Sequence, residues 1–219
     1  ITALCDMGPD NLTRAVEIVR KAQGHEPATY GKSKEDYKDL LQRGDVDAVM
    51  ISTPTKWHCP MAIEAMKAGK HVASEVPACH NLDECWALVK TKEQTGRHYI
   101  MLENYLFAEE NLAVLNMVAQ GVFGEPYYAE CGYIHELKGL KVKPDGSLTW
   151  RGELARSMYG NSYPTHSAGP VCKWLGINEG DRLQRLTCYS TGPNRSMPLY
   201  YAKRFGKEKA KKLTWRSAD

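Results

Sequence analysis

The sequence predicts a mixed α/β protein whose first half is a parallel sheet with helices on both faces. Two observations support this fold class. From residue 1 to residue 104, short apolar runs alternate with runs of helical spacing, and the connections between them are only a few residues long. Such alternation is typical of a parallel sheet. After residue 104 the alternation stops, and we expect a second, α+β domain over residues 105–219.

The first domain, residues 1–104, contains five expected strands and four expected helices. The strands are expected at 1–5, in a brief run ending at Tyr30, and at 47–51, 71–74 and 98–102, and the helices at 12–22, 34–41, 61–66 and 82–94. The run 47–51 is continuously apolar, which is typical of a strand buried on both faces. Together these elements predict a Rossmann-type sheet.

Polar residues stand at the carboxyl ends of four expected strands. They are Asp6, the loop 53–58, Glu75, and the pair Glu103 and Asn104. Ligands of parallel sheets gather at these strand ends. Four polar groups in equivalent places therefore indicate contacts to one extended ligand.

Asp6 closes an early strand and can accept both ribose hydroxyls of an adenosine, which favours NAD over its 2′-phosphorylated form. The alternative is an Asx-turn before Gly8. The expected glycine-rich G-x-G-x-x-G loop does not occur in the sequence. We therefore expect that the chain begins in the second strand of the sheet, without the first βα unit.

The second domain, residues 105–219, is expected to form a mainly antiparallel sheet and to be truncated at its C-terminal end. A helix is expected around 112–118. Residues 126–135 alternate as in an antiparallel strand, and 185–190 predicts another. Residues 138–162, which include Trp150 and Arg151, are rich in Gly and Lys and predict a loop.

The stretch 160–170 brings Tyr163, Thr165 and His166 together beside Pro164 and predicts a turn that leads into a short helix. A phenol, a hydroxyl and an imidazole in one rigid turn suit acid/base chemistry on an alcohol. The structural alternative is a helix start at which Thr165 is the cap and His166 is a satisfied polar residue.

Composition excludes several functional classes. The 219 residues carry a net charge of +3, which is too small to indicate a nucleic-acid partner, and the basic run 203–212 is expected to be a solvated helix face. No apolar run has the length of a membrane span. The seven cysteines lack C-x-x-C spacing, so neither a disulfide framework nor a metal site is expected.

The segments Asp47 to Pro54, Ala68 to Val72 and Glu75 to Pro77, together with His58, resemble the family of glucose–fructose oxidoreductase and inositol 2-dehydrogenase. Dehydrogenases of that family carry a proton-transferring lysine where this chain has Val76. This departure puts simple dehydrogenation in doubt.

The Glu-Val-Pro sequence, with Glu103, Trp150 and the motif Tyr163 to His166, is similar to the NAD-dependent glycosidases of glycoside hydrolase family 109, typified by α-N-acetylgalactosaminidase. The resemblance implies NAD contacts at Asp6, Thr55, Lys56, Trp57, His58, Glu75, Val76 and Asn104. It implies substrate contacts at Tyr133, Arg151, Tyr163, Pro164, Thr165 and His166.

The resemblance also implies a redox mechanism in which C3 of a sugar is oxidised by hydride transfer to NAD, C2 loses a proton and the group at C1 leaves. Water then adds, and reduction of the C3 ketone regenerates NAD. His166 then suits the base for the C3 hydroxyl. Tyr133 is the first candidate for the C2 proton, with Tyr163 as the second and Arg151 as the cation that lowers the phenol pKa. Three roles stay open for Glu103: it orients His166, it contacts the sugar, or it is only a solvated residue at a strand end.

Two other functions stay open from the sequence: a sugar or inositol dehydrogenase, and a dinucleotide-binding sensor without catalysis. The expected partner is a small-molecule or glycan substrate. A homo-oligomer that forms through the sheet of the second domain is a further expectation.

Overall fold

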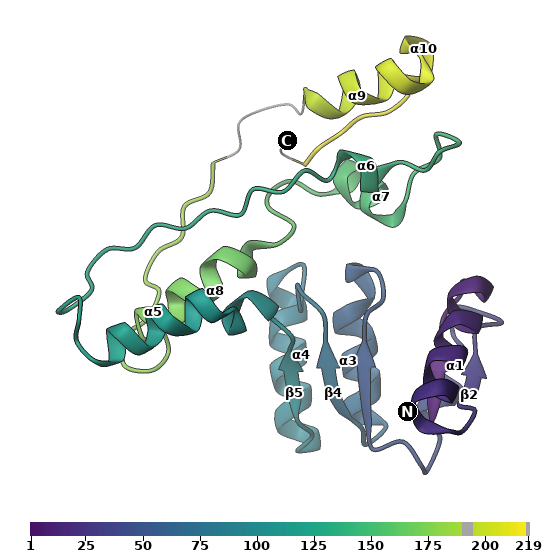
Figure 1. Ribbon diagram of the computed structural model, residues 1–219, viewed down its shortest axis with the longest axis horizontal. Coiled ribbons are helices and arrows are strands. Elements are labelled where there is room, and N and C mark those ends of the chain that lie inside the picture. Colours follow the sequence, from purple (N-terminus) through teal and green to yellow (C-terminus); the bar gives the residue numbers. More distant parts are fainter. Residues whose placement is uncertain (190–194, 218–219) are drawn as a thin grey trace. The chain divides into compact units, whose positions relative to one another are not determined.

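The computed structural model describes residues 1–189 and 195–217. The chain divides into two compact units, residues 1–102 (unit 1) and 103–219 (unit 2), and most of their elements are labelled in Figure 1. Glu103 and Asn104, which the sequence analysis placed at the end of the first domain, belong to unit 2.

Unit 1 contains five short parallel strands in two sheets. The strands are β1 (Ala3–Cys5), β2 (Ala28–Tyr30), β3 (Ala48–Ile51), β4 (His71–Ser74) and β5 (Tyr99–Met101). β1 pairs with β2, and β4 lies between β3 and β5. The predicted α/β fold with parallel strands is therefore confirmed.

The four helices expected in unit 1 are present, although three of them begin at residues other than those predicted. The helical elements of unit 1 are α1 (Pro9–Gln23), α2 (Tyr37–Leu41), the 3-10 turn η1 (Thr55–Trp57), α3 (His58–Lys67) and α4 (Leu82–Thr95). The Asn81 side chain caps α4 by accepting a hydrogen bond from the Glu84 N–H. α1 and α4 end at Gly24 and Gly96, which adopt the left-handed conformation with φ of 73° and 65°.

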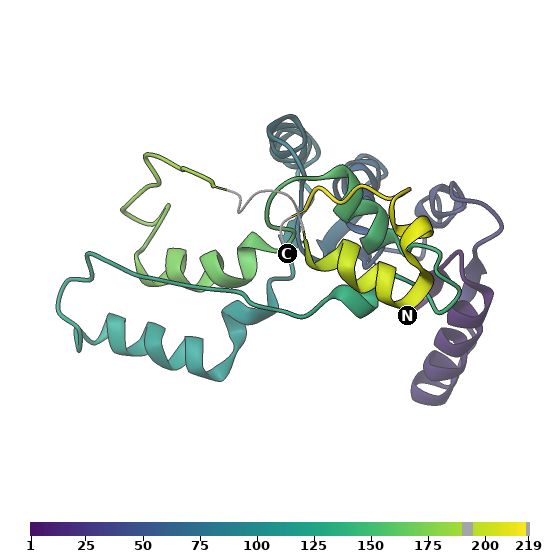
Figure 2. The ribbon, with the colours of Figure 1, turned by 90° about the horizontal axis from the view of Figure 1, so that it is seen from above.

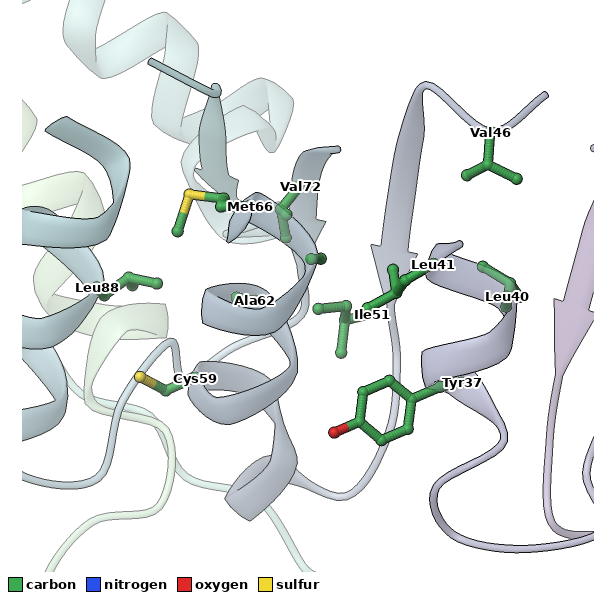
Figure 3. Close-up of a cluster of buried hydrophobic side chains, with 11 residues drawn as sticks. Tyr37, Leu40, Leu41, Val46, Ile51, Cys59, Ala62, Met66, Val72 and Leu88 are labelled. Carbon is green, nitrogen blue, oxygen red and sulfur yellow. The ribbon is translucent and has the colours of Figure 1, made fainter. Parts of the chain in front are cut away.

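The core of unit 1 is one apolar cluster. Figure 3 shows Leu41 of α2 close to Ile51 of β3, and Met66 of α3 close to Val72 of β4. Ala62 and Met66 are fully buried, so α3 is the central helix of this cluster.

Strand β3 differs from its prediction. The apolar run 47–51 predicts burial on both faces, but the side chain of Met50 is 66% exposed. Within the described residues, β1 and β3 each pair with a strand on one side only, because the two sheets are not joined by hydrogen bonds. A strand with a free edge and an uncovered face leaves part of its apolar surface to solvent.

Unit 2 is helical in its described part. Its elements are the 3-10 turn η2 (Asn104–Phe107), α5 (Glu109–Ala119), α6 (Lys138–Lys141), α7 (Trp150–Ser157), α8 (Pro164–Trp174), α9 (Ser196–Phe205) and α10 (Lys207–Ala210). Figure 2 shows α5 beside α8, where the Trp174 indole N–H donates to the Asn111 carbonyl oxygen at 3.1 Å. A second apolar cluster joins α7 and α9 around Ala155, Met197 and Trp215.

The expected antiparallel sheet of the second domain does not form in the described residues. Residues 126–135 are extended but have no strand partner, and the same holds for 185–189, while residue 190 lies outside the described part. Alternation sets the direction of the side chains, but a strand also needs a partner for its backbone groups. The side chains of Tyr127, Ile134 and Leu186 are accordingly exposed. The oligomer expected through this sheet stays a prediction.

The expected loop 138–162 is also partly wrong, because both α6 and α7 lie in it. Thr149 starts α7 by accepting a hydrogen bond from the Gly152 N–H, a capping signal that the Gly- and Lys-rich composition masked. The lysines and arginine of 203–212 are exposed on α9 and α10 or just beyond, in agreement with a solvated face. Across 1–189 and 195–217, no helix combines the length and the apolar character of a membrane span.

Candidate active site

The centre of the candidate site is a contact between Glu103 and His166. Glu103 lies directly before η2 and His166 in the first turn of α8, so a contact between η2 and α8 brings them together. The imidazole Nδ1 lies 2.7 Å from Glu103 Oε1, and the two side chains are only 9% and 5% exposed. An ionised carboxylate can only accept, so Nδ1 is the donor and Nε2 keeps the lone pair in the neutral ring.

The Glu103 carboxylate is held in place by the backbone. Its Oε1 also accepts a hydrogen bond from the Tyr105 N–H at 3.0 Å, which caps η2. Its second oxygen, Oε2, is buried and has no hydrogen-bond partner among the described residues. A buried carboxylate oxygen without a partner is costly, and a sugar hydroxyl could satisfy it. Of the alternatives that the sequence left open for Glu103, strand-end solvation is therefore wrong.

Three tyrosine rings surround the His166 imidazole. Tyr163 stacks on it with the ring centres 5.4 Å apart and the planes 6° from parallel. Tyr105 and Tyr133 pack at centre distances of 4.7 and 4.8 Å in tilted orientations. The site therefore combines one imidazole, one carboxylate and three phenols, which is a set suited to proton transfer on hydroxyl groups.

Tyr163 and Tyr133 have different polar neighbours. Arg151 Nε donates to the Tyr163 hydroxyl at 3.4 Å, and its guanidinium group stacks on Trp150 at 4.1 Å. The Tyr133 hydroxyl contacts His135 Nδ1 at 2.9 Å. Arg151, which was expected first beside Tyr133, therefore contacts Tyr163 instead.

The pKa of Tyr133 moves opposite to the sequence expectation. Burial raises it, and the nearby phenols of Tyr105 and Tyr163 and the Glu103 carboxylate raise it further. A phenolate at Tyr133 would be partly desolvated and close to other acidic groups. Tyr133 is therefore less suited to act as a base than the sequence analysis expected.

The start of α8 does not follow the helix-cap alternative. The N-cap is Tyr163, Pro164 is the first helical residue, and Thr165 lies inside the first turn. The Thr165 hydroxyl oxygen is buried and has no hydrogen-bond partner within the described parts of the chain. Thr165 as the cap is therefore wrong, and its hydroxyl remains available to a ligand.

In unit 1, all the residues expected to contact NAD except Asp6 lie in two segments that His58 joins. The imidazole Nε2 lies 2.8 Å from the Thr53 carbonyl oxygen and Nδ1 2.9 Å from that of Pro77. His58 therefore ties the loop after β3 to the loop after β4, which carries Glu75 and Val76. His58 is fully buried and links these two loops from inside unit 1.

Other residues on these strand ends fit a polar ligand to different degrees. The Thr55 hydroxyl is buried and unpartnered among the described residues, as expected of a group that binds a cofactor oxygen. Lys56 is exposed, Trp57 partly so, and Val76 is buried. Asp6 forms the Asx-turn that the sequence left open, because its Oδ1 accepts from the Gly8 N–H at 2.6 Å. Asn104, the last expected NAD contact, lies in unit 2.

The sequence analysis did not identify two residues of the site, Tyr105 and His135. Tyr105 contacts both His166 and Tyr133, and His135 contacts the Tyr133 hydroxyl. Tyr105 directly follows Glu103 and Asn104, so proximity in sequence to two candidate residues was the available signal. His135 lies at i+2 from Tyr133, on the same face of an extended segment.

Known families match both halves of the chain. Residues 2–103 match "Oxidoreductase family, NAD-binding Rossmann fold", and residues 107–219 match "Glycosyl hydrolase 109, C-terminal domain". The expectation of a Rossmann-type domain with NAD as its cofactor is thereby confirmed.

Similar proteins agree with these matches. Glycosyl hydrolase family 109 proteins from Shewanella pealeana and Shewanella baltica are 43% and 44% identical over 206 residues, which cover 94% of this chain and 45% of each relative. The chain thus spans about half the length of these relatives. A myo-inositol 2-dehydrogenase from Lactobacillus plantarum shares the fold, with a TM-score of 0.62 at 20% identity over 80% of this chain and 48% of that one. From both family matches and these relatives, the chain belongs to glycosyl hydrolase family 109.

Proposed function

We propose that this chain provides the NAD-binding and sugar-binding parts of a glycosidase that uses NAD catalytically and releases terminal N-acetylgalactosamine. The observation that carries the proposal is the Glu103–His166 contact at 2.7 Å, enclosed by three tyrosines in a family named for glycoside hydrolysis. Most glycosidases use two carboxylates that flank the bond to be cleaved, and NAD-dependent enzymes are known exceptions. An imidazole with a positioned carboxylate suits oxidation of an alcohol better than direct displacement.

His166 is the proposed base for the C3 hydroxyl of the sugar. Glu103 holds the Nδ1–H, so Nε2 can accept the hydroxyl proton, and the carboxylate stabilises the resulting imidazolium. When bound, NAD would supply hydride-transfer chemistry at C3. The unpartnered oxygens Glu103 Oε2 and Thr165 Oγ1 are proposed to bind other sugar hydroxyls.

Tyr163 is the proposed acceptor of the C2 proton. A ketone at C3 makes the C2–H bond acidic, so a base can remove that proton while the C1–oxygen bond breaks and the leaving group takes a proton. Arg151 donates to the Tyr163 oxygen and is a cation beside it. Tyr133, whose pKa is raised by burial, is proposed to bind sugar as a neutral phenol.

The proposed NAD contacts are Asp6, the segment 55–58, Glu75 and Val76 in unit 1, and Asn104 in unit 2. Support comes from the buried Thr55 hydroxyl and from the His58 link between the two loops. Arg151 and Pro164 complete the proposed substrate contacts.

A sugar or inositol dehydrogenase is the competing function. Val76 opposes it, because a buried apolar side chain cannot transfer a proton where such dehydrogenases use lysine. The sensor alternative has no use for the buried Glu103–His166 pair.

The test is hydrogen exchange at C2 during turnover. With the chain extended to its relatives' full length, an α-N-acetylgalactosaminide in heavy water should yield sugar that carries deuterium at C2, with no net NADH. Proton nuclear magnetic resonance of the sugar and absorbance of NADH measure the two outcomes. Accumulating NADH would indicate a dehydrogenase, and sugar released without deuterium would exclude the redox route.

His166→Ala should abolish both release and exchange, because the C2 proton becomes acidic only after C3 is oxidised. His25→Ala, on the exposed surface of unit 1, is the matched control and should retain both. Unchanged exchange in His166→Ala would exclude His166 as the base.

A further inference from the structure

Away from the candidate active site, three potential metal ligands converge inside unit 1. The Sγ atoms of Cys59 and Cys79 and one carboxylate oxygen of Glu84 all lie within 4.8 Å of one another. Cys59 is the second residue of α3, Cys79 lies in the loop after β4, and Glu84 is in the first turn of α4. The fold therefore collects these groups from three elements.

Cys85 adds a third sulfur next to this group. Both the Cys59 and the Cys85 thiols are close enough to raise the pKa of the Cys79 thiol, and the Cys59 thiol donates to the Glu84 carbonyl oxygen at 3.5 Å. Three sulfurs and one carboxylate oxygen make up the four donors of a tetrahedral site. With Zn–S bonds of about 2.3 Å, two sulfurs of such a site lie about 3.8 Å apart. The Cys59 and Cys79 sulfurs, which lie within 4.8 Å of each other, would therefore need to approach by about 1 Å or less, and Cys85 would join them from the first turn of α4.

The surroundings favour negatively charged ligands. Cys59, Glu84 and Cys85 all stand in the first turns of α3 and α4, whose N-terminal ends carry partial positive charge. Cys59 is 1% exposed, so water competes little for its sulfur. Thiolates select soft cations over Mg²⁺ or Ca²⁺.

Two simpler explanations account for only part of this cluster. Cys59 belongs to the apolar core and Cys79 packs against it, so each thiol could serve packing alone. Glu84 Oε2 accepts from the His80 N–H at 2.7 Å, as in a helix-capping arrangement. Neither packing nor helix capping requires cysteine sulfurs to lie beside the Glu84 carboxylate. The other oxygen of that carboxylate, Oε1, can still accept a hydrogen bond or bind a cation.

We propose that Cys59, Cys79 and Glu84, with Cys85 as the fourth donor, bind one Zn²⁺ ion. The site stabilises the fold and takes no part in the reaction. Cys59 directly follows His58, and Cys79 lies two residues after Pro77, so the ion reinforces the link that His58 makes between the loops after β3 and β4. This proposed zinc site does not depend on the proposed glycosidase function.

Without the ion, the thiols hold their protons. Burial raises the pKa of Cys79, and the neighbouring Cys59 and Cys85 thiols raise it further, while burial also raises the pKa of Cys59. Zinc binding must therefore displace thiol protons. This release is a signal that packed, neutral thiols do not produce.

The test is Zn²⁺ titration of the reduced chain against a chromophoric chelator, with proton release measured in weak buffer. We expect one ion per chain and release of about two to three protons. Co²⁺ in place of Zn²⁺ should give the intense visible bands of tetrahedral thiolate coordination. Binding of several ions without proton release, or octahedral Co²⁺ bands, would overturn the proposal.

Cys79→Ser and Glu84→Gln change partly exposed ligands, so the fold should tolerate them, and each should weaken Zn²⁺ binding at least tenfold. Cys5→Ser, at an exposed cysteine of the same unit, is the matched control and should bind as the parent does. Zn²⁺ should raise the Tm of the parent and of Cys5→Ser, but not that of Cys79→Ser. Equal affinity in all variants would overturn the proposal, as would a Cys59–Cys79 disulfide that forms in air while the reduced chain binds no Zn²⁺.

Discussion

Tyr133 and Tyr163 both pack on His166, but only Tyr163 has a cation at its hydroxyl. Arg151 lies 3.4 Å from that oxygen, whereas Tyr133 contacts His135. Burial raises the pKa of Tyr133, so its phenol stays protonated through the neutral range. A base must release and take up its proton near working pH. The Arg151 cation would favour a phenolate at Tyr163, which is the reason for proposing Tyr163 rather than Tyr133 as the base.

The exchange of the C2 proton should separate the two tyrosines. Tyr163→Phe should slow deuterium incorporation about 10²-fold or more, the range typical of losing a general base. Tyr133→Phe should slow it about tenfold or less, because a neutral phenol contributes only binding. Incorporation rates under saturating substrate measure both. The opposite ranking would return Tyr133 to the role that the sequence analysis assigned to it.

At the scale of single elements, the turn after β2 depends on a glycine. A Cβ at Gly31 would lie 2.2 Å from the carbonyl oxygen of Asp6, which is backbone and cannot swing away. The Gly31 N–H also donates to Asp36 Oδ2 at 3.0 Å, so the turn cannot shift without losing that bond. The β1–β2 pair therefore requires glycine here.

Gly31→Ala should lower the free energy of unfolding by about 1–3 kcal/mol, the usual cost of overpacking. Gly44→Ala is the matched control, since a Cβ there meets nothing within 4 Å. It should change stability by about 0.5 kcal/mol or less. Urea unfolding followed by circular dichroism measures the difference, and equal values for the two variants would contradict the predicted clash.

Strands β4 and β5 are joined by a buried side-chain hydrogen bond as well as by their backbones. Ser74 Oγ lies 2.6 Å from the Tyr99 hydroxyl, and Ser74 is 0% exposed. Burial raises the pKa of Tyr99 to about 12, although the Ser74 hydrogen bond opposes the shift. The fold therefore favours the neutral phenol over the phenolate.

The stability of unit 1 should fall at alkaline pH for this reason. Tyr99 has a higher pKa in the folded than in the unfolded state, where it is about 10. The stabilisation that the neutral Tyr99 phenol gives the folded state is complete below a pH of about 10. It is lost as the pH rises towards the folded-state pKa of Tyr99, by up to about 1.4 kcal/mol per pH unit. Urea unfolding between pH 8 and 11 should show a smaller decline in Ser74→Ala/Tyr99→Phe. A decline equal to that of the parent would contradict this origin.

At the scale of the whole molecule, unit 1 has a sheet in two parts. In the described residues, β1 pairs only with β2, while β3 pairs only with β4, so the two sheets share no strand. The Met50 side chain on β3 is exposed.

The chain of 219 residues should bind NAD poorly, because its sequence contains no glycine-rich G-x-G-x-x-G turn to bind a pyrophosphate. Calorimetric titration should show an affinity well below that of a chain with its relatives' full length. Micromolar NAD affinity in the 219-residue chain would contradict this expectation.

The sequence by itself was sufficient to predict the order of strands and helices in unit 1 and to propose candidate residues for the chemistry. Strand and helix alternation and the terminal glycines depend on neighbouring residues, so local patterns are sufficient to predict them. The same patterns failed for 126–135, because an extended segment becomes a strand only when another segment pairs with it.

Only the tertiary structure decided which of these residues meet. Glu103 and His166 are 63 residues apart in sequence, and the packing of η2 against α8 selects the carboxylate that holds the imidazole. Packing likewise brings Arg151 to the Tyr163 hydroxyl. It also brings together Cys59 and Cys79, although their spacing in the sequence matches no known motif. Contacts between distant residues depend on how whole elements pack, whereas the sequence pattern reports only what each element does locally.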